Sequence, residues 1–198
     1  MNITWFIIRG SGIVAFALLS ASLAWGLMVS TKVFGRAIKA KGLQWLHESL
    51  GLAAVIATVI HLVSLSMDEY IDFTWADILI PGFAEWRPLA AALGGVAFWS
   101  LLVVALSFYV KKWIGQDTWR SIHYLSFGTF FAAVLHGVFS GTDTGNPWVA
   151  GLYVGSTVLV VLLTAVRIIS SREPQRQPDV KRTAVVTTGN GDQSTRRE

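Results

Sequence analysis

Five long apolar runs, separated by polar residues, dominate the sequence. They cover approximately residues 4–30, 47–67, 89–110, 121–139 and 148–169. A helix needs roughly 20 apolar residues to cross the hydrocarbon core of a bilayer, and each run has about that length. None of the runs alternates with a period of two, as the strands of a membrane barrel would. We therefore predict an all-α fold, an integral membrane bundle of five transmembrane helices.

The composition excludes several other classes of protein. Charged residues make up only 14% of the chain and hydrophobic residues 53%, whereas a soluble domain has about 25% charged residues. There is no cysteine, which rules out disulfides, thiolate metal sites, iron–sulfur clusters and thioether-linked haem. The first apolar run is too long for a cleaved signal peptide, and its basic cluster follows it instead of preceding it. We expect this run to be a retained helix.

The distribution of Lys and Arg predicts the orientation of the bundle. Of the 16 basic residues, all except Arg9 and Arg87 lie in segments 32–41, 111–120 and 167–197. Basic loops face the cytoplasm, so we expect the N-terminus outside and the C-terminus in the cytoplasm. The net charge of +4 then reflects topology, and no nucleic-acid partner is expected. Membrane lipid is the expected surrounding.

Two polar segments lie outside the apolar runs. Residues 171–198 are rich in Arg, Gln, Thr, Gly and Asp, and we expect a disordered cytoplasmic tail behind a membrane domain of residues 1–170. This tail is too short to hold a flavin or nicotinamide domain. Segment 68–88 interleaves aromatic and acidic residues, which predicts a short amphipathic element on the outer surface, broken at Pro81-Gly82. A re-entrant arrangement, giving a sixth helix, stays open.

The four histidines of the chain fall in only two of the predicted helices. His47 and His61 are 14 residues apart, and His123 and His136 are 13 apart. Both helices are expected to run from the cytoplasm outwards, which places His47 level with His123 and His61 level with His136, about 20 Å further along. Two axial imidazoles are typical of electron-transfer haem. The spacing predicts two b-type haems, the histidines being the ligands of the haem iron.

Other interpretations of the histidines stay open. Each could hydrogen-bond to a neighbouring helix, or the set could relay protons in a transporter, although no intramembrane Asp or Glu continues a relay. A zinc or copper site would need its ligands clustered. Thirteen residues also overshoot one helix face by about 140°, so the second helix is distorted or the two haems are rotated. Gly51 and Gly128 are expected to let a porphyrin approach the backbone.

The chain resembles the ferric-reductase-like transmembrane domain family over roughly residues 5–170. The histidine spacings carry the resemblance most specifically. Softer matches are Arg9-Gly10-Ser11-Gly12, Glu85-Trp86-Arg87-Pro88, Trp119-Arg120-Ser121-Ile122-His123-Tyr124 and the segment from His136 to Asp143. That family includes NADPH oxidases, ferric reductases and the haem subunit of the bacterial periplasmic methionine-sulfoxide reductase system. The larger relatives have a fused flavin domain and usually six helices, from which this chain departs.

The resemblance implies the membrane haem subunit of an oxidoreductase, multi-pass in a bacterial cell membrane. Electrons would come from a cytoplasmic flavoprotein reductase or a quinol and leave to an extracytoplasmic acceptor or partner protein. It also leaves open the binding of FMN. The alternative is a non-redox haem-binding protein or a histidine-dependent, proton-coupled transporter. No catalytic triad, phosphate loop or carboxylate dyad is present, and we predict no catalytic residue.

Several basic residues are candidates for binding the haem carboxylates. Arg9 and Arg87 are expected either to pair with the propionates of the outer haem or to extend to the lipid headgroups. Arg36 and Arg120 could meet the inner propionates, although the orientation rule already accounts for both. Glu48, next to His47, is a candidate for orienting a neighbour.

Overall fold

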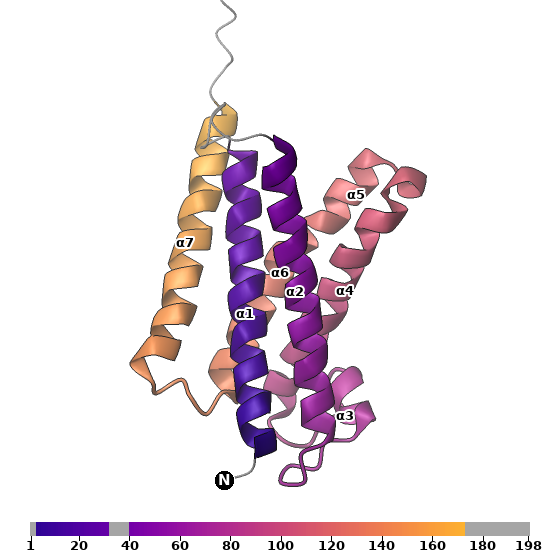
Figure 1. Cartoon of the computed structure of the whole chain (residues 1–198), viewed down its shortest axis with the longest axis vertical. Helices are drawn as coiled ribbons and strands as arrows, with labels where there is room; N and C mark the ends of the chain where they lie inside the picture. The colour runs from indigo at the N-terminus through magenta and orange to yellow at the C-terminus, as the bar shows by residue number, and fades with distance from the viewer. Residues whose placement is uncertain (1–2, 32–39, 173–198) are drawn as a thin grey trace, which may run out of the picture.

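The structure is a computed structural model that describes residues 3–31 and 40–172. In this part of the chain every regular element is a helix. The helices are α1 (Ile3–Ser30), α2 (Ala40–Ser66), α3 (Trp75–Leu79), α4 (Pro88–Ile114), α5 (Gln116–His123), α6 (Leu125–Ser140) and α7 (Pro147–Arg172) (Figure 1). The predicted all-α fold is therefore confirmed.

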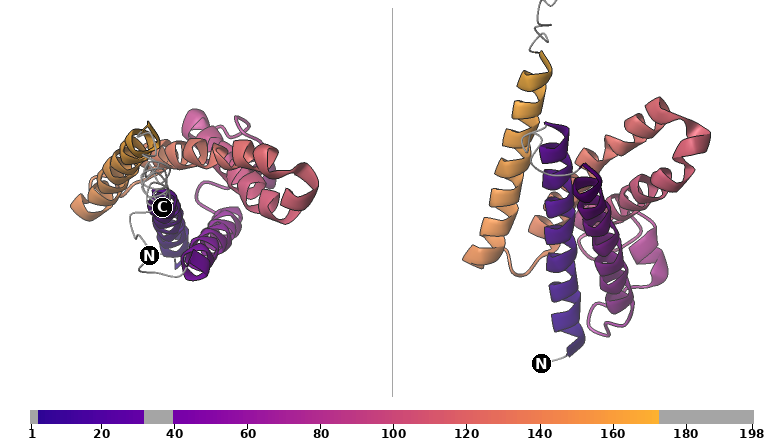
Figure 2. Two further views of the ribbon diagram at one scale, coloured as in Figure 1. Left: turned by 90° about the horizontal axis from the view of Figure 1, so that it is seen from above. Right: turned by 45° about the horizontal axis from the view of Figure 1, so that its top comes forward.

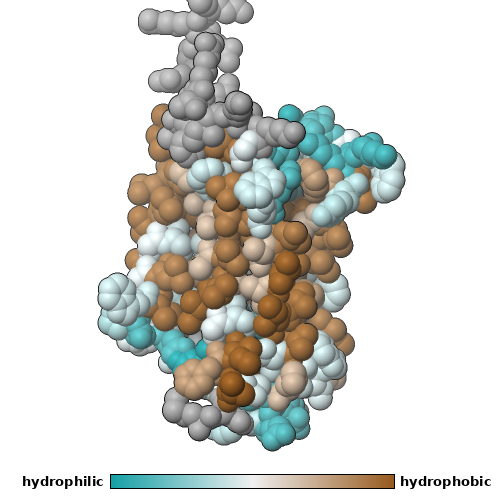
Figure 3. All heavy atoms as spheres, in the orientation of Figure 1, coloured by the Kyte–Doolittle hydropathy of each residue, from teal (hydrophilic) through white to brown (hydrophobic). Residues whose placement is uncertain are grey.

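Five segments of the described chain are long and apolar enough to cross a membrane. They are α1, most of α2, α4, the α5–α6 unit and α7. The side chains on the outside of the bundle are mainly hydrophobic across its middle, and polar groups gather towards the two ends (Figure 3). A surface of this kind is stable only in lipid, because in water a broad apolar belt would be exposed to solvent. The chain is thus a multi-pass membrane protein.

The helices form an antiparallel bundle built around α1. Helix α2 lies along one side of α1 and α7 along another, while α6 packs against both α1 and α4 (Figures 1 and 2). The buried core joins α1, α6 and α7 through Phe16, Leu23, Leu27, Phe130 and Val160. We call the end of the bundle where α1 begins the Arg9 end, and the opposite end the tail end.

The fourth span is distorted near its middle. Distortion of this helix was one of the two explanations offered for the spacing of 13 residues between His123 and His136. Helix α5 ends at His123 and α6 begins at Leu125, with Tyr124 between them. The amide of Phe127 bonds the carbonyl of Tyr124 at 3.2 Å, a tighter turn than the α-helical one. Tyr124 itself keeps helical backbone angles, so the distortion is confined to this turn. The second span also starts at Ala40, seven residues before the predicted position.

Segment 67–87 contains one short helix and no additional span. The Thr74 side chain accepts a hydrogen bond from the amide of Asp77, and the Asp77 carboxylate accepts one from the amide of Thr74. This capping box starts α3, and the helix ends before Pro81, as predicted. The Thr74 hydroxyl also donates to the Asp77 carboxylate, and this hydrogen bond, followed by the one from the Thr74 amide, holds the pKa of Asp77 below its usual range.

Two predicted segments lie mostly outside the described residues. The basic loop 32–41 is described only for the backbone from Ala40 onwards, so the predicted role of Arg36 is outside the described chain. The tail predicted over 171–198 is described only at residues 171 and 172, where it continues α7.

Candidate functional site

The four histidines lie in two pairs, one nearer each end of the bundle. The imidazole centroids of His47 and His123 are 5.9 Å apart, and those of His61 and His136 are 6.5 Å apart. The ring planes cross at 73° and 78°. The pairing by depth that the spacing predicted is therefore present in the structure. The role of these imidazoles as ligands stays a prediction.

Three of the imidazoles are oriented by backbone carbonyls. The Nδ1 atom of His47 lies 2.9 Å from the carbonyl oxygen of Ser22, and that of His61 lies 2.9 Å from Ile8. The Nδ1 atom of His136 lies 2.7 Å from the carbonyl oxygen of Ala90. A carbonyl can only accept, so Nδ1 carries the proton in each ring. The remaining nitrogen, Nε2, is then the unprotonated atom that can ligate a metal.

A glycine lies four residues after each of these three carbonyls. A Cβ built on Gly26 would lie 3.0 Å from His47, and one on Gly12 would lie 3.1 Å from His61. On Gly94 it would lie 2.6 Å from His136. In a helix, the side chain at position i+4 lies over the carbonyl at position i. Each glycine thus leaves its carbonyl open to an imidazole from the neighbouring helix.

The repeated arrangement on α1 follows from helix register. Gly12 and Gly26 are 14 residues apart, and so are His61 and His47 on the antiparallel α2. Two antiparallel helices in contact keep such equal spacings opposite each other. Small residues at membrane interfaces are typical of close helix approach, but here they also receive functional side chains. Gly51 and Gly128, which were predicted to let a porphyrin approach the backbone, lie near Ser22 and Leu125.

His123 is held differently from the other three histidines. Its imidazole makes no hydrogen bond with any described residue. Instead it stacks on the indole of Trp119, with centroids 5.0 Å apart and planes at 24°. Both residues belong to α5, whose connection to α6 is broken at Tyr124. His123 is thus the least constrained member of the four.

The ring separations test whether a metal fits between the paired imidazoles. A metal–imidazole bond is about 2 Å long and a ring nitrogen lies about 1 Å from the ring centroid, so two axial rings are roughly 6 Å apart. The observed 5.9 Å and 6.5 Å fit this value. The two rings of a pair make no described hydrogen bond with each other, so a direct contact between the imidazoles does not account for this separation. The donor set therefore fits a bis-imidazole iron.

A cavity of about 350 Å³ adjoins the pair at the Arg9 end. Its lining includes Gly12, His61, Gly94, His136 and Tyr153, and most of the other lining residues are apolar. A largely apolar cavity with a few convergent polar groups is typical of cofactor sites. The planar ring system of a haem matches such a lining better than a small polar ligand would.

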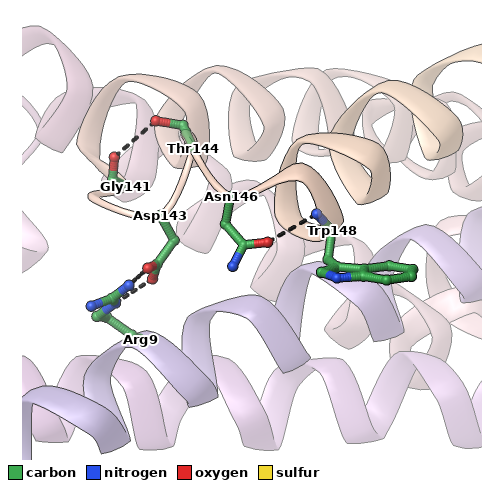
Figure 4. A network of polar contacts seen from close by, with 6 residues as sticks. All are labelled: Arg9, Gly141, Asp143, Thr144, Asn146 and Trp148. Carbon is green, nitrogen blue, oxygen red and sulfur yellow. Dashed lines mark hydrogen bonds and ion pairs between the residues drawn. The ribbon is translucent and has the colours of Figure 1, made fainter.

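Arg9 has a partner that the sequence did not predict. Its guanidinium forms an ion pair with the carboxylate of Asp143, in the connection between α6 and α7 (Figure 4). Both side chains are about three-quarters buried, and the Arg9 guanidinium also lies 3.7 Å from the centroid of Trp5. The ion pair fastens the α6–α7 connection to α1 beside the cavity. Arg9 therefore does not simply extend to the headgroups.

The other candidate charged residues also have partners within the described chain. Arg87 adopts a left-handed backbone conformation before α4, and its guanidinium donates to the carbonyl of Phe139 at 2.5 Å. Arg120 lies 3.4 Å from Asp117 on the exposed side of α5. Glu48 accepts a hydrogen bond from Gln44 at 2.9 Å and makes no described contact with His47.

Three features of the site escaped the sequence reasoning. From the sequence, Gly94 could be assigned only to helix packing and Asp143 only to a polar loop. Trp119 could be assigned only to the membrane interface. The equal spacing of Gly12–Gly26 and His47–His61 was a usable signal, because it matches an antiparallel helix pair. Nothing in the sequence pointed to Asp143 as the partner of Arg9.

Comparisons with known proteins supply no relative for this chain. No family model, no curated protein and no solved structure matches it. Among the described residues, no group of three or more His, Cys, Asp or Glu side chains gathers to hold a metal ion. The paired histidines are therefore the feature that points to a function.

Proposed function

We propose that this protein is a transmembrane electron conduit that holds two b-type haems, one between His47 and His123 and one between His61 and His136. The observation that carries the proposal is the pair of ring separations, 5.9 Å and 6.5 Å. A haem held by two histidines would supply reversible one-electron transfer.

The chain's own residues would position the cofactors and exclude water. The carbonyls of Ser22, Ile8 and Ala90 accept from Nδ1 and so fix the ring orientation of three histidines. Hydrogen bonds of this kind also raise the basicity of the ligand nitrogen. The apolar helices surround the imidazoles, which favours electron transfer across the membrane over reaction with solvent.

The direction of transfer follows from the charge distribution. Among the described residues, Lys111, Lys112, Arg120 and Arg167 lie at the tail end, so this end would face the cytoplasm and the Arg9 end the outside. The donor would be a cytoplasmic flavoprotein or a quinol, and the acceptor would lie outside the cytoplasm. A negatively charged flavoprotein would be steered to the basic tail end, with an association rate that falls at high salt.

Spectroscopy of the purified protein tests the proposal. Reduced-minus-oxidised spectra should show b-type bands, and a pyridine haemochrome assay should give two haems per chain. His61→Ala or His136→Ala should remove one component, and His47→Ala or His123→Ala the other. A matched control is Trp45→Phe on α2, which is exposed and outside both pairs.

Two results would contradict the proposal. If all four histidine variants lose the same spectral component, the two-site arrangement is wrong. If the purified protein shows no b-type bands while it moves protons in proteoliposomes, the histidines serve a transporter instead.

A further inference from the structure

The indole nitrogen of Trp119 is buried and has no hydrogen-bond partner within the described part of the chain. Buried donors of this kind are rare in native structures, and each calls for an explanation such as a ligand. The Trp119 ring stacks on His123, a member of the tail-end histidine pair. The unpartnered donor is therefore next to a proposed axial ligand.

Two cations from different helices lie near this part of α5. The Nζ atom of Lys111, near the end of α4, lies 4.0 Å from the centroid of the Trp119 ring. Arg167, on α7, lies 3.4 Å from the hydroxyl of Tyr124, the residue after His123. The described carboxylate on α5, Asp117, is almost fully exposed and pairs with Arg120 instead.

We propose that Trp119, Lys111 and Arg167 bind a carboxylate of the haem held between His47 and His123. This inference rests on the proposed function and adds the residues that recognise the acidic edge of the tail-end haem. A buried N–H donor with cations nearby is complementary to a carboxylate, which accepts hydrogen bonds only. The carboxylate would supply the indole with its missing partner and neutralise part of the local positive charge.

The same helix end offers a matched control pair. Trp113 and Lys112 have the same residue types as Trp119 and Lys111, with the Lys112 Nζ atom 5.7 Å from the Trp113 ring. Trp113 is 75% exposed, so water can satisfy its indole nitrogen. Trp113→Phe therefore removes an indole N–H from the same polar region without removing a buried donor.

The experiment compares haem with its dimethyl ester, in which both carboxylates are blocked. Binding to the tail-end site alone is measured in a His61→Ala/His136→Ala background, in a detergent without phosphate. We expect the chain with Trp119 intact to prefer free haem over the ester by about 10-fold, the usual order for a charge-assisted hydrogen bond. Trp119→Phe keeps the ring stacking and should reduce that preference to about threefold or less. Trp113→Phe should leave it unchanged.

A second measurement uses the otherwise unaltered chain, in case the double histidine background does not fold. In protein loaded with both haems, Trp119→Phe and Lys111→Met should each lower the midpoint potential of the tail-end haem, because the carboxylate charge is then less compensated. The potential of the other haem should stay constant. Trp113→Phe and Lys112→Met should move neither potential.

The outcomes separate this inference from the proposed function. If neither haem nor the ester binds, the proposed function fails and this inference fails with it. If haem binds but Trp119→Phe keeps the full preference for free haem, only this inference is overturned. A lipid phosphate is the competing source of an anion. In that case Trp119→Phe would lower the amount of copurified phosphatidylglycerol and leave the haem preference intact, which also overturns the inference.

Discussion

Replacing Gly94 by alanine tests the mechanism by which the helices receive their histidines. The added Cβ would lie 2.6 Å from both Cε1 and Nδ1 of His136, whereas ordinary contact begins at 3.4 Å. The imidazole must therefore move by about 1 Å, the distance between these two values. Such a move lengthens the 2.7 Å contact between Nδ1 and the Ala90 carbonyl beyond hydrogen-bonding range.

The expected magnitude follows from that lost hydrogen bond. Removing the partner that orients a metal-ligating histidine reduces metal affinity by about 10–100-fold, or roughly 1.4–2.8 kcal/mol. We therefore expect Gly94→Ala to weaken haem binding at the Arg9 end by about 10–100-fold while the tail-end haem is retained. Gly26→Ala and Gly12→Ala, with closest approaches of 3.0 Å and 3.1 Å, should have smaller effects at their own sites.

The assay is haem titration of the purified variants, followed by difference spectra of each component. Gly151→Ala on α7 is the control, because a Cβ there meets no atom within 4 Å. Circular dichroism checks that the helices form. Full haem occupancy and an unchanged spectrum in Gly94→Ala would refute the reasoning, since the imidazole cannot keep its position beside that Cβ.

Four further predictions concern the rest of the site. Asp143→Asn should speed haem loss at the Arg9 end by a few-fold in a haem-transfer assay, while Arg120→Gln, which breaks an exposed ion pair, should not. Added cyanide should displace the tail-end ligand His123 first, seen as a spectral change in one component, because no hydrogen bond with a described residue orients its ring. Ring planes at 73° and 78° predict a strongly anisotropic low-spin electron paramagnetic resonance signal for both ferric haems, and a near-rhombic signal typical of parallel rings would contradict this. Because the pKa of Asp77 is lowered, its carboxylate stabilises α3 fully at pH values above the ordinary carboxyl pKa of 3.8, and this stabilisation is lost as the pH falls through the lowered folded-state pKa; fluorescence should report the change, and Asp77→Asn should abolish it.

Most of the fold could be predicted from the sequence because a membrane requires one element length and one composition. Each apolar run had to be a helix of about 20 residues, and α1, α4 and α7 end within a few residues of the predicted positions. The early start of α2 was missed because its first turns include polar residues, which hydropathy assigns to a loop. Tyr124 carries no breaking signal of its own, so the break between α5 and α6 was visible only through the histidine spacing.

The histidine pairs could be predicted from spacing, but their supporting residues could not. Depth along a helix is a linear function of sequence position, so matched depths follow from counting. Which side chain meets which carbonyl depends on rotation about the helix axis and on the choice of neighbour. The ion pair of Arg9 with Asp143 spans 134 residues of chain, and nothing local in the sequence relates the two.

The difference between the two histidine pairs has a physical origin in the register of α4. The hairpin formed by α4 and α5 turns at Gly115, so residues equally distant from Gly115 lie opposite each other. By that rule His136 faces Gly94, as observed, and the position facing His123 is Ser107, which is buried. A serine side chain fills the space that glycine leaves open, so the same arrangement cannot be repeated there. The imidazole of His123 is therefore positioned by stacking on Trp119, where the other three histidines are positioned by a hydrogen bond to a backbone carbonyl.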